Sequence, residues 1–186
     1  MIANLVVVLF LLAPTSTTSL MESVSTPEPV PAKLLLTPIH EGLAKGRWML
    51  KVKKFEGFYS KPYTCAGGRS TIGYGFTADD FADRKLPRSI TKEQADVMLN
   101  KVWNNHRKLV EKSVKVPLNP YQRAALVSFS YNLGEGRLRE LVGRLNHGNY
   151  QSITEELPTY RKARGRVLAG LVKRRAWEAS MFAQTI

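Results

Sequence analysis

Residues 55–77 read FEGFYSKPYTCAGGRSTIGYGFT, a stretch that combines an acidic side chain with aromatic residues, glycines and the single cysteine of the chain. Glu56 lies between Phe55 and Phe58. Aromatic neighbours can partly desolvate a carboxyl, and desolvation favours the protonated form that a general acid needs. The glycines that follow are suited to tight turns and to close approach of a ligand to the backbone: Gly67, Gly68, Gly73 and Gly75.

The residues before Glu56 and those after it differ in periodicity. From Gly46 the apolar side chains of Met49, Val52 and Phe55 recur every three residues, which predicts a helix with Glu56 at its C-terminal end. Residues 62–77 break that period with a proline, a Gly-Gly turn and alternating apolar residues. That pattern predicts a small antiparallel sheet.

The rest of the chain is predicted to be helical. Thr91 and Gln94 form a capping-box pattern that opens a helix to about residue 112. Asn119 and Pro120 supply an N-cap and a first-turn proline for an almost wholly apolar helix that stops near Gly134. Further helices are expected at about 136–146, 150–157 and 166–183. The prediction is an α+β fold, with a binding cleft between the sheet and the helical lobe.

The net charge is unevenly distributed along the chain. The 186 residues carry a formal charge of +13, whereas residues 1–45 have a net charge of −1. The strongly basic remainder favours a polyanionic partner, which can be nucleic acid, anionic lipid or a cell-wall polymer. Because lysine and arginine are spread along the whole domain and form no single run, the pattern does not favour nucleic acid.

The N-terminal region is expected to be separate from the domain. Residues 2–13 are nearly all apolar, which is the length of a signal-peptide core and is too short to span a bilayer. Three interpretations stay open for residues 1–20: a cleaved signal, an uncleaved signal-anchor, or a misassigned start before Met21. Residues 21–41, rich in Pro, Ser and Thr, are expected to form a linker, and residues 42–186 the globular domain.

The cysteine and histidine content speaks against some site types. One cysteine excludes an intrachain disulfide. His40, His106 and His147 are far apart and lack ligand spacing, so no metal site is expected.

Three segments carry a resemblance to a known family. The spacing Glu56-x8-Cys65-x5-Thr71, followed by Ile-Gly-Tyr-Gly, resembles the phage-type lysozymes, the endolysins of glycoside hydrolase family 24. Residues 125–134, ALVSFSYNLG, look like the central buried helix of that family. Residues 170–182, from GLVKRR to Phe182, look like its C-terminal helix. The resemblance covers roughly residues 42–186 and implies a lysozyme-like fold.

The resemblance implies hydrolysis of the β-1,4 bond between N-acetylmuramic acid and N-acetylglucosamine in peptidoglycan, without a cofactor. Glu56 takes the place of the general acid, Cys65 the place of an Asp or Cys, and Thr71 that of a residue which positions water. Either Arg174 or Arg175 is expected to reach the back of Glu56. The pKa of a thiol is ordinarily about 8.5, so a cysteine is a poor base at neutral pH and is better suited to orienting water.

The family resemblance also sets the expected partners and location. They are bacterial peptidoglycan, anionic envelope polymers at the basic surface and transient membrane contact of residues 1–20, with a monomeric protein and no nucleic acid. The protein is expected to be exported or membrane-tethered and to act on the cell wall, or to wait in the host cytoplasm before lysis.

Two other function classes fit parts of the sequence. A cysteine peptidase or amidase would use Cys65 with His106 or His147. Against it, Cys65 lies in a predicted sheet segment, whereas such nucleophiles are activated by a helix N-terminus or an adjacent base. A non-enzymatic cationic protein that binds the cell envelope would account for the charge but would leave the Glu–Cys–Thr segment without a role.

Overall fold

The structure is a computed structural model, and it describes residues 38–65 and 68–184. These residues belong to the unit Pro31–Ile186, and the unit Met1–Val30 lies outside the described residues. The elements follow in the order α1 (Pro38–Glu56), β1 (Tyr59–Thr64), β2 (Ser70–Gly73), η1 (Ala78–Asp80), α2 (Lys92–Ser113), α3 (Pro120–Leu141), η2 (Leu145–His147), α4 (Gln151–Glu156), η3 (Leu157–Thr159), β3 (Lys162–Ala163), β4 (Arg166–Val167) and α5 (Ala169–Phe182). This order confirms the predicted α+β arrangement.

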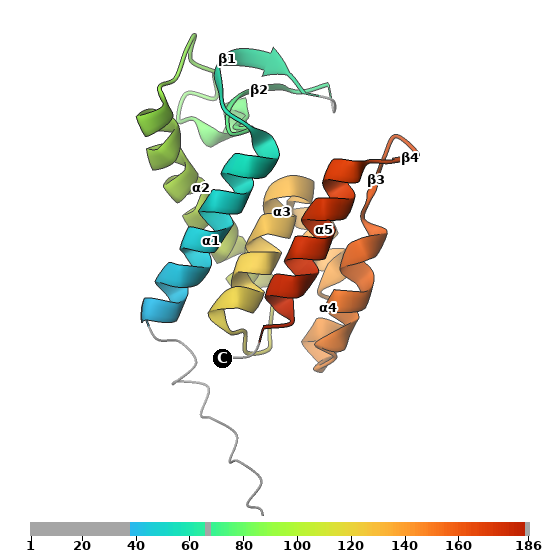
Figure 1. Cartoon of the computed structure of the whole chain (residues 1–186). Helices are drawn as coiled ribbons and strands as arrows, with labels where there is room; N and C mark the ends of the chain where they lie inside the picture. Colours follow the sequence, from blue (N-terminus) through green and yellow to red (C-terminus); the bar gives the residue numbers. More distant parts are fainter. Residues whose placement is uncertain (1–37, 66–67, 185–186) are drawn as a thin grey trace, which may run out of the picture. The chain divides into compact units, whose positions relative to one another are not determined.

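Helix α3 is the central element of the helical part. It packs against α1, α2 and α5, and these contacts can be followed in Figure 1. Residues 124–130 are all buried, as expected for the almost wholly apolar part of this helix. A helix that is apolar all round is stable only when its neighbours cover every face, so α3 fixes the positions of the three helices around it.

Side-chain caps start α2 and α3 where the sequence predicts them. The backbone amide of Gln94 donates to the Thr91 hydroxyl at 3.2 Å, and that of Gln122 donates to the Asn119 side chain at 2.9 Å. Gly134 interrupts α3 with φ 82° and ψ 179°, but helical turns resume and continue to Leu141. The predicted stop at Gly134 is therefore a kink, and the helix expected at 136–146 is largely the continuation of α3.

Two antiparallel hairpins complete the fold. Strands β1 and β2 pair with Tyr63 opposite Thr71 and Thr64 opposite Ser70, which confirms the predicted small sheet. The second hairpin, β3–β4, was not expected, because the last helix was predicted to begin at residue 166 and α5 begins at Ala169. Arg164 and Gly165 both have positive φ, 48° and 78°, and this two-residue turn reverses the chain before α5 can start.

The beginning of α1 differs from the expected domain boundary. The helix begins at Pro38, so residues 38–41, expected to be linker, are helical. Proline is favourable in a first helical turn, where its missing N–H donor has no intrahelical partner. Within the described residues, no helix is both long and apolar enough to cross a membrane. The apolar segment 1–20 and most of the expected linker 21–41 lie outside the described residues.

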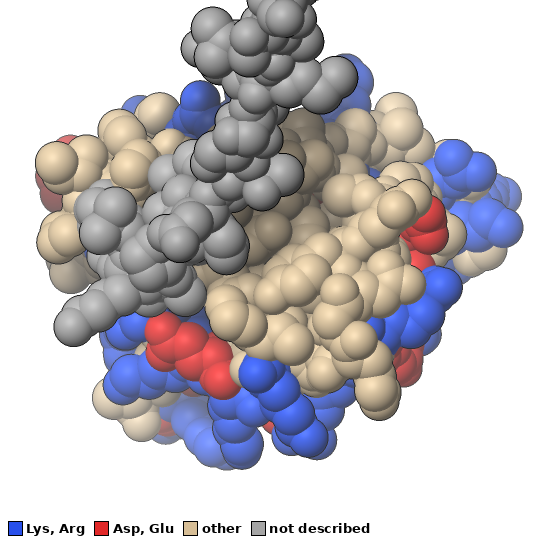
Figure 2. Space-filling view, turned by 90° about the horizontal axis from the view of Figure 1, so that it is seen from below, with Lys and Arg blue, Asp and Glu red and all other residues tan. Residues whose placement is uncertain are grey.

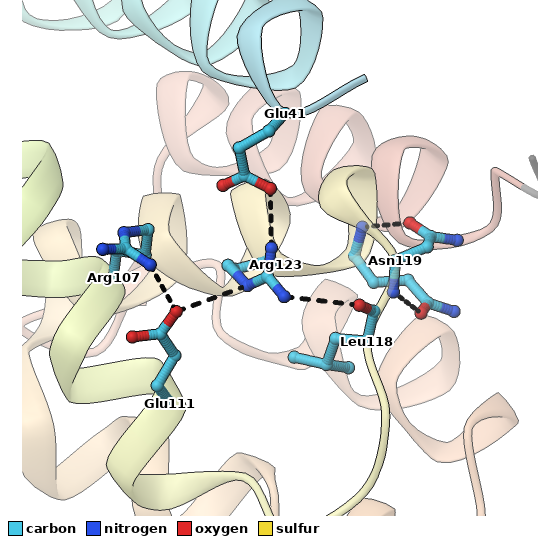
Figure 3. Close-up of polar contacts among 7 residues, drawn as sticks. Glu41, Arg107, Glu111, Leu118, Asn119 and Arg123 are labelled. Carbon is cyan, nitrogen blue, oxygen red and sulfur yellow. Dashed lines mark hydrogen bonds and ion pairs between the residues drawn. The ribbon is translucent and has the colours of Figure 1, made fainter. Parts of the chain in front are cut away.

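An arginine of α3 holds the first turns of α1 in place (Figure 3). Arg123 Nη1 lies 2.6 Å from Glu41 Oε2, and Arg123 Nε lies 4.0 Å from Glu111 Oε1 on α2. Arg123 Nη2 also donates to the Leu118 carbonyl at 3.5 Å. One guanidinium therefore connects α1, α2 and the segment that precedes α3.

Aromatic side chains form the core between α1, α2 and α3. The rings of Trp48 and Trp103 have centroids 4.9 Å apart, and Trp48 also contacts Tyr131 edge-on at 5.9 Å. Trp48 and Trp103 are buried, as expected of core aromatics. Their burial fixes α1 against α3, so the C-terminal end of α1 has a defined place relative to α3 and α5.

Candidate active site

Glu56 is the last residue of α1, and its carboxyl contacts an arginine from the far end of the chain. Arg174 Nη1 on α5 donates to Glu56 Oε1 at 2.5 Å. The Arg174 side chain is 4% exposed, whereas that of Glu56 is 23% exposed. One edge of the Glu56 carboxyl is thus held by a buried cation while the side chain keeps access to solvent.

The two arginine candidates have different partners. Arg174 contacts Glu56, while Arg175 donates to the Asn132 side chain and lies 2.8 Å from Glu178. Residues one apart on a helix point about 100° away from each other, so the two guanidiniums leave α5 in different directions. Of the two arginines, Arg174 is the one in contact with Glu56.

Gly75 leaves room for the second carboxyl oxygen. A Cβ atom at this position would lie 3.3 Å from Glu56 Oε2 and 3.5 Å from the Tyr131 hydroxyl. Gly75 also has φ 94°, which other residues rarely adopt. The Tyr131 hydroxyl donates to the Tyr74 carbonyl at 2.6 Å and so ties this turn to α3. The turn after β2 therefore approaches Glu56 closely.

Aromatic rings surround the Glu56–Arg174 pair. The Arg174 guanidinium lies 5.4 Å from the centroid of Phe55 and 6.0 Å from that of Tyr131. Trp177 contacts Phe55 edge-on at 6.2 Å. Burial raises the pKa of the Tyr131 hydroxyl well above its ordinary value, and Glu56 and Asp80 raise it further. Tyr131 is therefore neutral at physiological pH.

Cys65 and Thr71 lie on the β1–β2 hairpin. The Cys65 amide donates to the Arg69 carbonyl at 2.9 Å, which extends the ladder one pair beyond Thr64 and Ser70. Side chains two residues apart on a strand share a face, so Cys65 lies on the face of Tyr63 and its partner Thr71. Thr71 is 5% exposed, and its hydroxyl is 3.5 Å from the Tyr63 carbonyl. The structure thus brings Cys65 and Thr71 to one face of one hairpin.

The histidines considered as partners of Cys65 are engaged in contacts of their own. His106 Nδ1 is 3.0 Å from the Ser130 hydroxyl, and its ring packs edge-on against Tyr131 at 5.6 Å. His147 Nδ1 is 3.0 Å from the Gly143 carbonyl. Burial lowers the pKa of His106. These contacts give the cysteine-peptidase alternative no support.

A buried charged network behind Glu56 was not predicted from sequence. Glu178 on α5 is fully buried and contacts both Arg174 and Arg175, while the Ser128 hydroxyl donates to it at 2.7 Å. The signal was present in the spacing, because Glu178 follows the two arginines by four and three residues and so shares their side of the helix. Tyr131 and Gly75 also lie at the site without having been assigned to it.

Within residues 38–65 and 68–184, no three His, Cys, Asp or Glu side chains are grouped in a way that could hold a metal ion.

The chain is similar to known proteins in both sequence and structure. Residues 53–178 match the protein family described as phage lysozyme. The chain is 38% identical over 135 residues to an endolysin of Bacillus phage PZA, an alignment that covers 70% of this chain and 51% of that protein. It is 31% identical over 125 residues to a SAR-endolysin of Bacteriophage PS119, covering 66% and 73%. The chain spans about half the length of the Bacillus phage endolysins that it matches.

A solved structure supports the same relationship. The muramidase domain of SpmX from Asticaccaulis excentricus superposes with a TM-score of 0.64 at 29% identity, covering 75% of this chain and 96% of that one. The fold is therefore lysozyme-like, as expected from the three sequence segments.

Proposed function

Because the chain belongs to the phage lysozyme family, we propose that it is a peptidoglycan hydrolase that cleaves the β-1,4 bond between N-acetylmuramic acid and N-acetylglucosamine. The observation that carries the proposal is the Glu56–Arg174 pair, in which a partly exposed carboxyl is fixed by a buried arginine. Such an acid has a defined position and still has access to a substrate.

Glu56 acts as the general acid in this mechanism. It donates a proton to the bridging oxygen, and the bond between that oxygen and the anomeric carbon breaks. A water molecule attacks the anomeric carbon from the opposite face of the sugar and loses a proton to solvent. Glu56 regains its proton for the next cycle. Attack from the opposite face inverts the anomeric configuration.

Cys65 and Thr71 orient the attacking water in the proposal. Their side chains share one face of the β1–β2 hairpin, so a single water can lie within reach of the thiol and the hydroxyl. Since the thiol is a weak base, the pair positions the water rather than fully deprotonating it. The cleft between the hairpin and the helical part remains a prediction.

The partner and location proposals extend the same activity. The face in Figure 2 has Lys and Arg side chains around its rim, with acidic side chains beside some of them. With a formal charge of +13, the chain attracts the carboxylates of peptidoglycan and the anionic polymers of the envelope. The enzyme works as a monomer and is exported or membrane-tethered through its N-terminal segment, acting on the cell wall.

The function is tested with Glu56→Gln, which removes the proton donor and keeps the side-chain volume. We expect release of reducing sugar from purified peptidoglycan to fall by a factor of about 10³ or more, with an unchanged melting temperature within a few degrees. Glu155→Gln, on the exposed side of α4, is the matched control and should keep full activity.

Several outcomes would contradict the proposal. Undiminished reducing-sugar release by Glu56→Gln would remove Glu56 as the acid. New free amines in place of reducing ends would indicate the peptidase. A heat-denatured protein that still kills cells and leaves peptidoglycan uncut would indicate a non-enzymatic cationic protein. The anomer formed first, read by NMR, tests inversion directly.

A further inference from the structure

Glu178 is a fully buried carboxyl one step removed from Glu56. Its Oε1 lies 3.4 Å from Arg174 Nε, and its Oε2 lies 2.8 Å from Arg175 Nη1. The Ser128 hydroxyl of α3 donates to Oε1 at 2.7 Å. Arg174 therefore contacts two carboxyls, that of Glu56 at Nη1 and that of Glu178 at Nε.

The groups in contact with Glu178 favour its ionised form, whereas its burial favours the protonated form. A guanidinium can only donate hydrogen bonds, so a protonated carboxyl would offer a donor where two more donors already lie. Burial raises the pKa of Glu178 above its ordinary value, and Arg175, Arg174 and Ser128 offset part of that rise. Burial also lowers the pKa of Arg175 to about 10, which leaves this side chain protonated at neutral pH. The network thus places one buried carboxyl, Glu178, between two buried guanidiniums.

Two arginines behind a proton donor create a chemical problem. A positive charge beside a carboxyl favours the carboxylate, but a general acid must enter the reaction protonated. A negative charge on the other side of the same arginine offsets this effect. Stability alone does not require Glu178, because buried ion pairs are often no more stabilising than apolar side chains of similar volume.

We propose that Glu178 is a positioning residue for the proton donor: it orients Arg174 against Glu56, and its negative charge keeps the arginine pair from withdrawing the proton that Glu56 must give. The proposal rests on the function proposed above. Glu178 touches no substrate in this scheme and acts through its contact with Arg174 and through its charge.

Other charged groups near Glu56 do not supply this compensation. Lys53 of α1 is paired with Asp96 of α2 at 2.7 Å. Tyr131 of α3 is neutral, since burial raises its pKa well above the ordinary value. Asp80 also raises the pKa of Tyr131. The Asp80 carboxylate accepts hydrogen bonds from the Thr77 amide at 2.8 Å and from the Thr77 hydroxyl at 3.2 Å. Apart from Glu56 itself, Glu178 is the carboxyl that the described contacts place against Arg174.

The test is the pH dependence of kcat for Glu178→Gln in the full chain. Removing the negative charge leaves both arginines uncompensated, so the alkaline limb of the profile should move to lower pH by about one unit. Arg175→Gln changes the charge in the opposite sense and should move the limb to higher pH. The double variant loses one charge of each sign and should return the limb close to that of the wild type.

A purely structural role predicts something else. Loss of packing or of folded protein lowers the amplitude of the profile in every variant and leaves the limb in place. If Glu178→Gln leaves the limb unchanged or moves it to higher pH, the proposal is wrong. Ser128→Ala removes a hydrogen bond to Glu178 without changing charge and should keep the limb of the wild type.

The Arg175 and Glu56 variants separate failure of this proposal from misfolding and from failure of the proposed function. If Glu178→Gln does not fold at the assay temperature, Arg175→Gln carries the test alone, and a limb that does not move to higher pH overturns the proposal. An active Glu56→Gln would refute the proposed acid. An inactive Glu56→Gln together with an unmoved limb in the Glu178 and Arg175 variants would refute only the role of Glu178.

Discussion

Both ends of α1 carry a glutamate that is held by an arginine of another helix. Glu41 meets Arg123 at 2.6 Å, and Glu56 meets Arg174 at 2.5 Å. The distances are nearly equal, but the surroundings differ. Arg123 has the 43% exposed Glu111 as its second carboxyl, whereas Arg174 has the fully buried Glu178.

The difference shows how one pair of residue types can have two uses. Around Arg123, the other contacts are a carbonyl and a solvent-facing carboxyl, so the pair connects α1 to α2 and α3. Around Arg174, the charges are compensated inside the protein, and Gly75 leaves room beside the free oxygen of Glu56. We infer that the Glu41–Arg123 pair stabilises the position of α1, and that the Glu56–Arg174 pair positions the general acid.

Arg174→Gln should have the largest effect on this comparison. It removes the cation that fixes Glu56 and leaves Glu178 with one arginine. We expect kcat to fall by a factor of about 100 or more, and the free energy of unfolding to fall by about 3 kcal/mol, because a buried pair loses one partner. Activity per folded molecule and urea denaturation measure the two effects.

Arg174→Lys is the conservative control. It keeps the charge but not the planar fork of donors, so it should recover part of the stability and only part of the activity. Full activity in Arg174→Gln at matched folded concentration would mean that the two ends of α1 do not differ in function.

Local signals in the sequence account for much of the fold. The caps at Thr91 and Asn119 place α2 and α3, because an N-cap is a contact between neighbours in sequence. The sequence pattern after Glu56 predicts a hairpin that the structure has, although β2 ends at Gly73, before the alternating residues Tyr74 and Phe76. The hairpin at residues 162–167 was missed because its turn has Arg164 at positive φ, a position where a glycine or asparagine would have been the signal.

The site was predictable only where its contacts are local or follow a motif. Glu56 at a helix end and the shared hairpin of Cys65 and Thr71 follow from the sequence. The choice of Arg174 over Arg175 depends on the rotation of α5 against α1, which packing decides. The spacing of Glu178 from the two arginines indicates a shared side of α5, but the burial of Glu178 depends on α3 covering α5, which no local pattern predicts.

Gly75→Ala should have the second-largest effect. The added methyl group would lie 3.3 Å from Glu56 Oε2 in a backbone conformation, φ 94°, that strains any residue with a Cβ. We expect kcat to fall about tenfold through displacement of the acid, with a loss of about 1–3 kcal/mol in stability. A loss of kcat larger than the loss of folded protein would show that Gly75 serves the position of Glu56 and not only the stability of the fold.

Gly136→Ala is the matched control for that substitution. A Cβ there would meet nothing within 4 Å, and the residue is not among the glycines with positive φ. The control should keep wild-type kcat and be at least as stable, since alanine is favoured over glycine in a helix. Equal activity losses in both variants would show that room beside Glu56 is not what Gly75 provides.

Arg123→Gln should have the smallest effect, and it should lower the free energy of unfolding without lowering kcat. Arg123 is 13% exposed, but its two carboxyl partners are 32% and 43% exposed, so solvent screens the charges. We expect a loss of about 1 kcal/mol in the free energy of unfolding, with kcat per folded molecule within about twofold of the wild type.

Arg107→Gln is the exposed control from the same cluster, where the pair with Glu111 should contribute less than about 0.5 kcal/mol. Arg123→Gln could instead lower kcat as strongly as Arg174→Gln does. In that case the contact at the start of α1 would also position the acid at its end, because a rigid helix would transmit the loss of one contact to the other end.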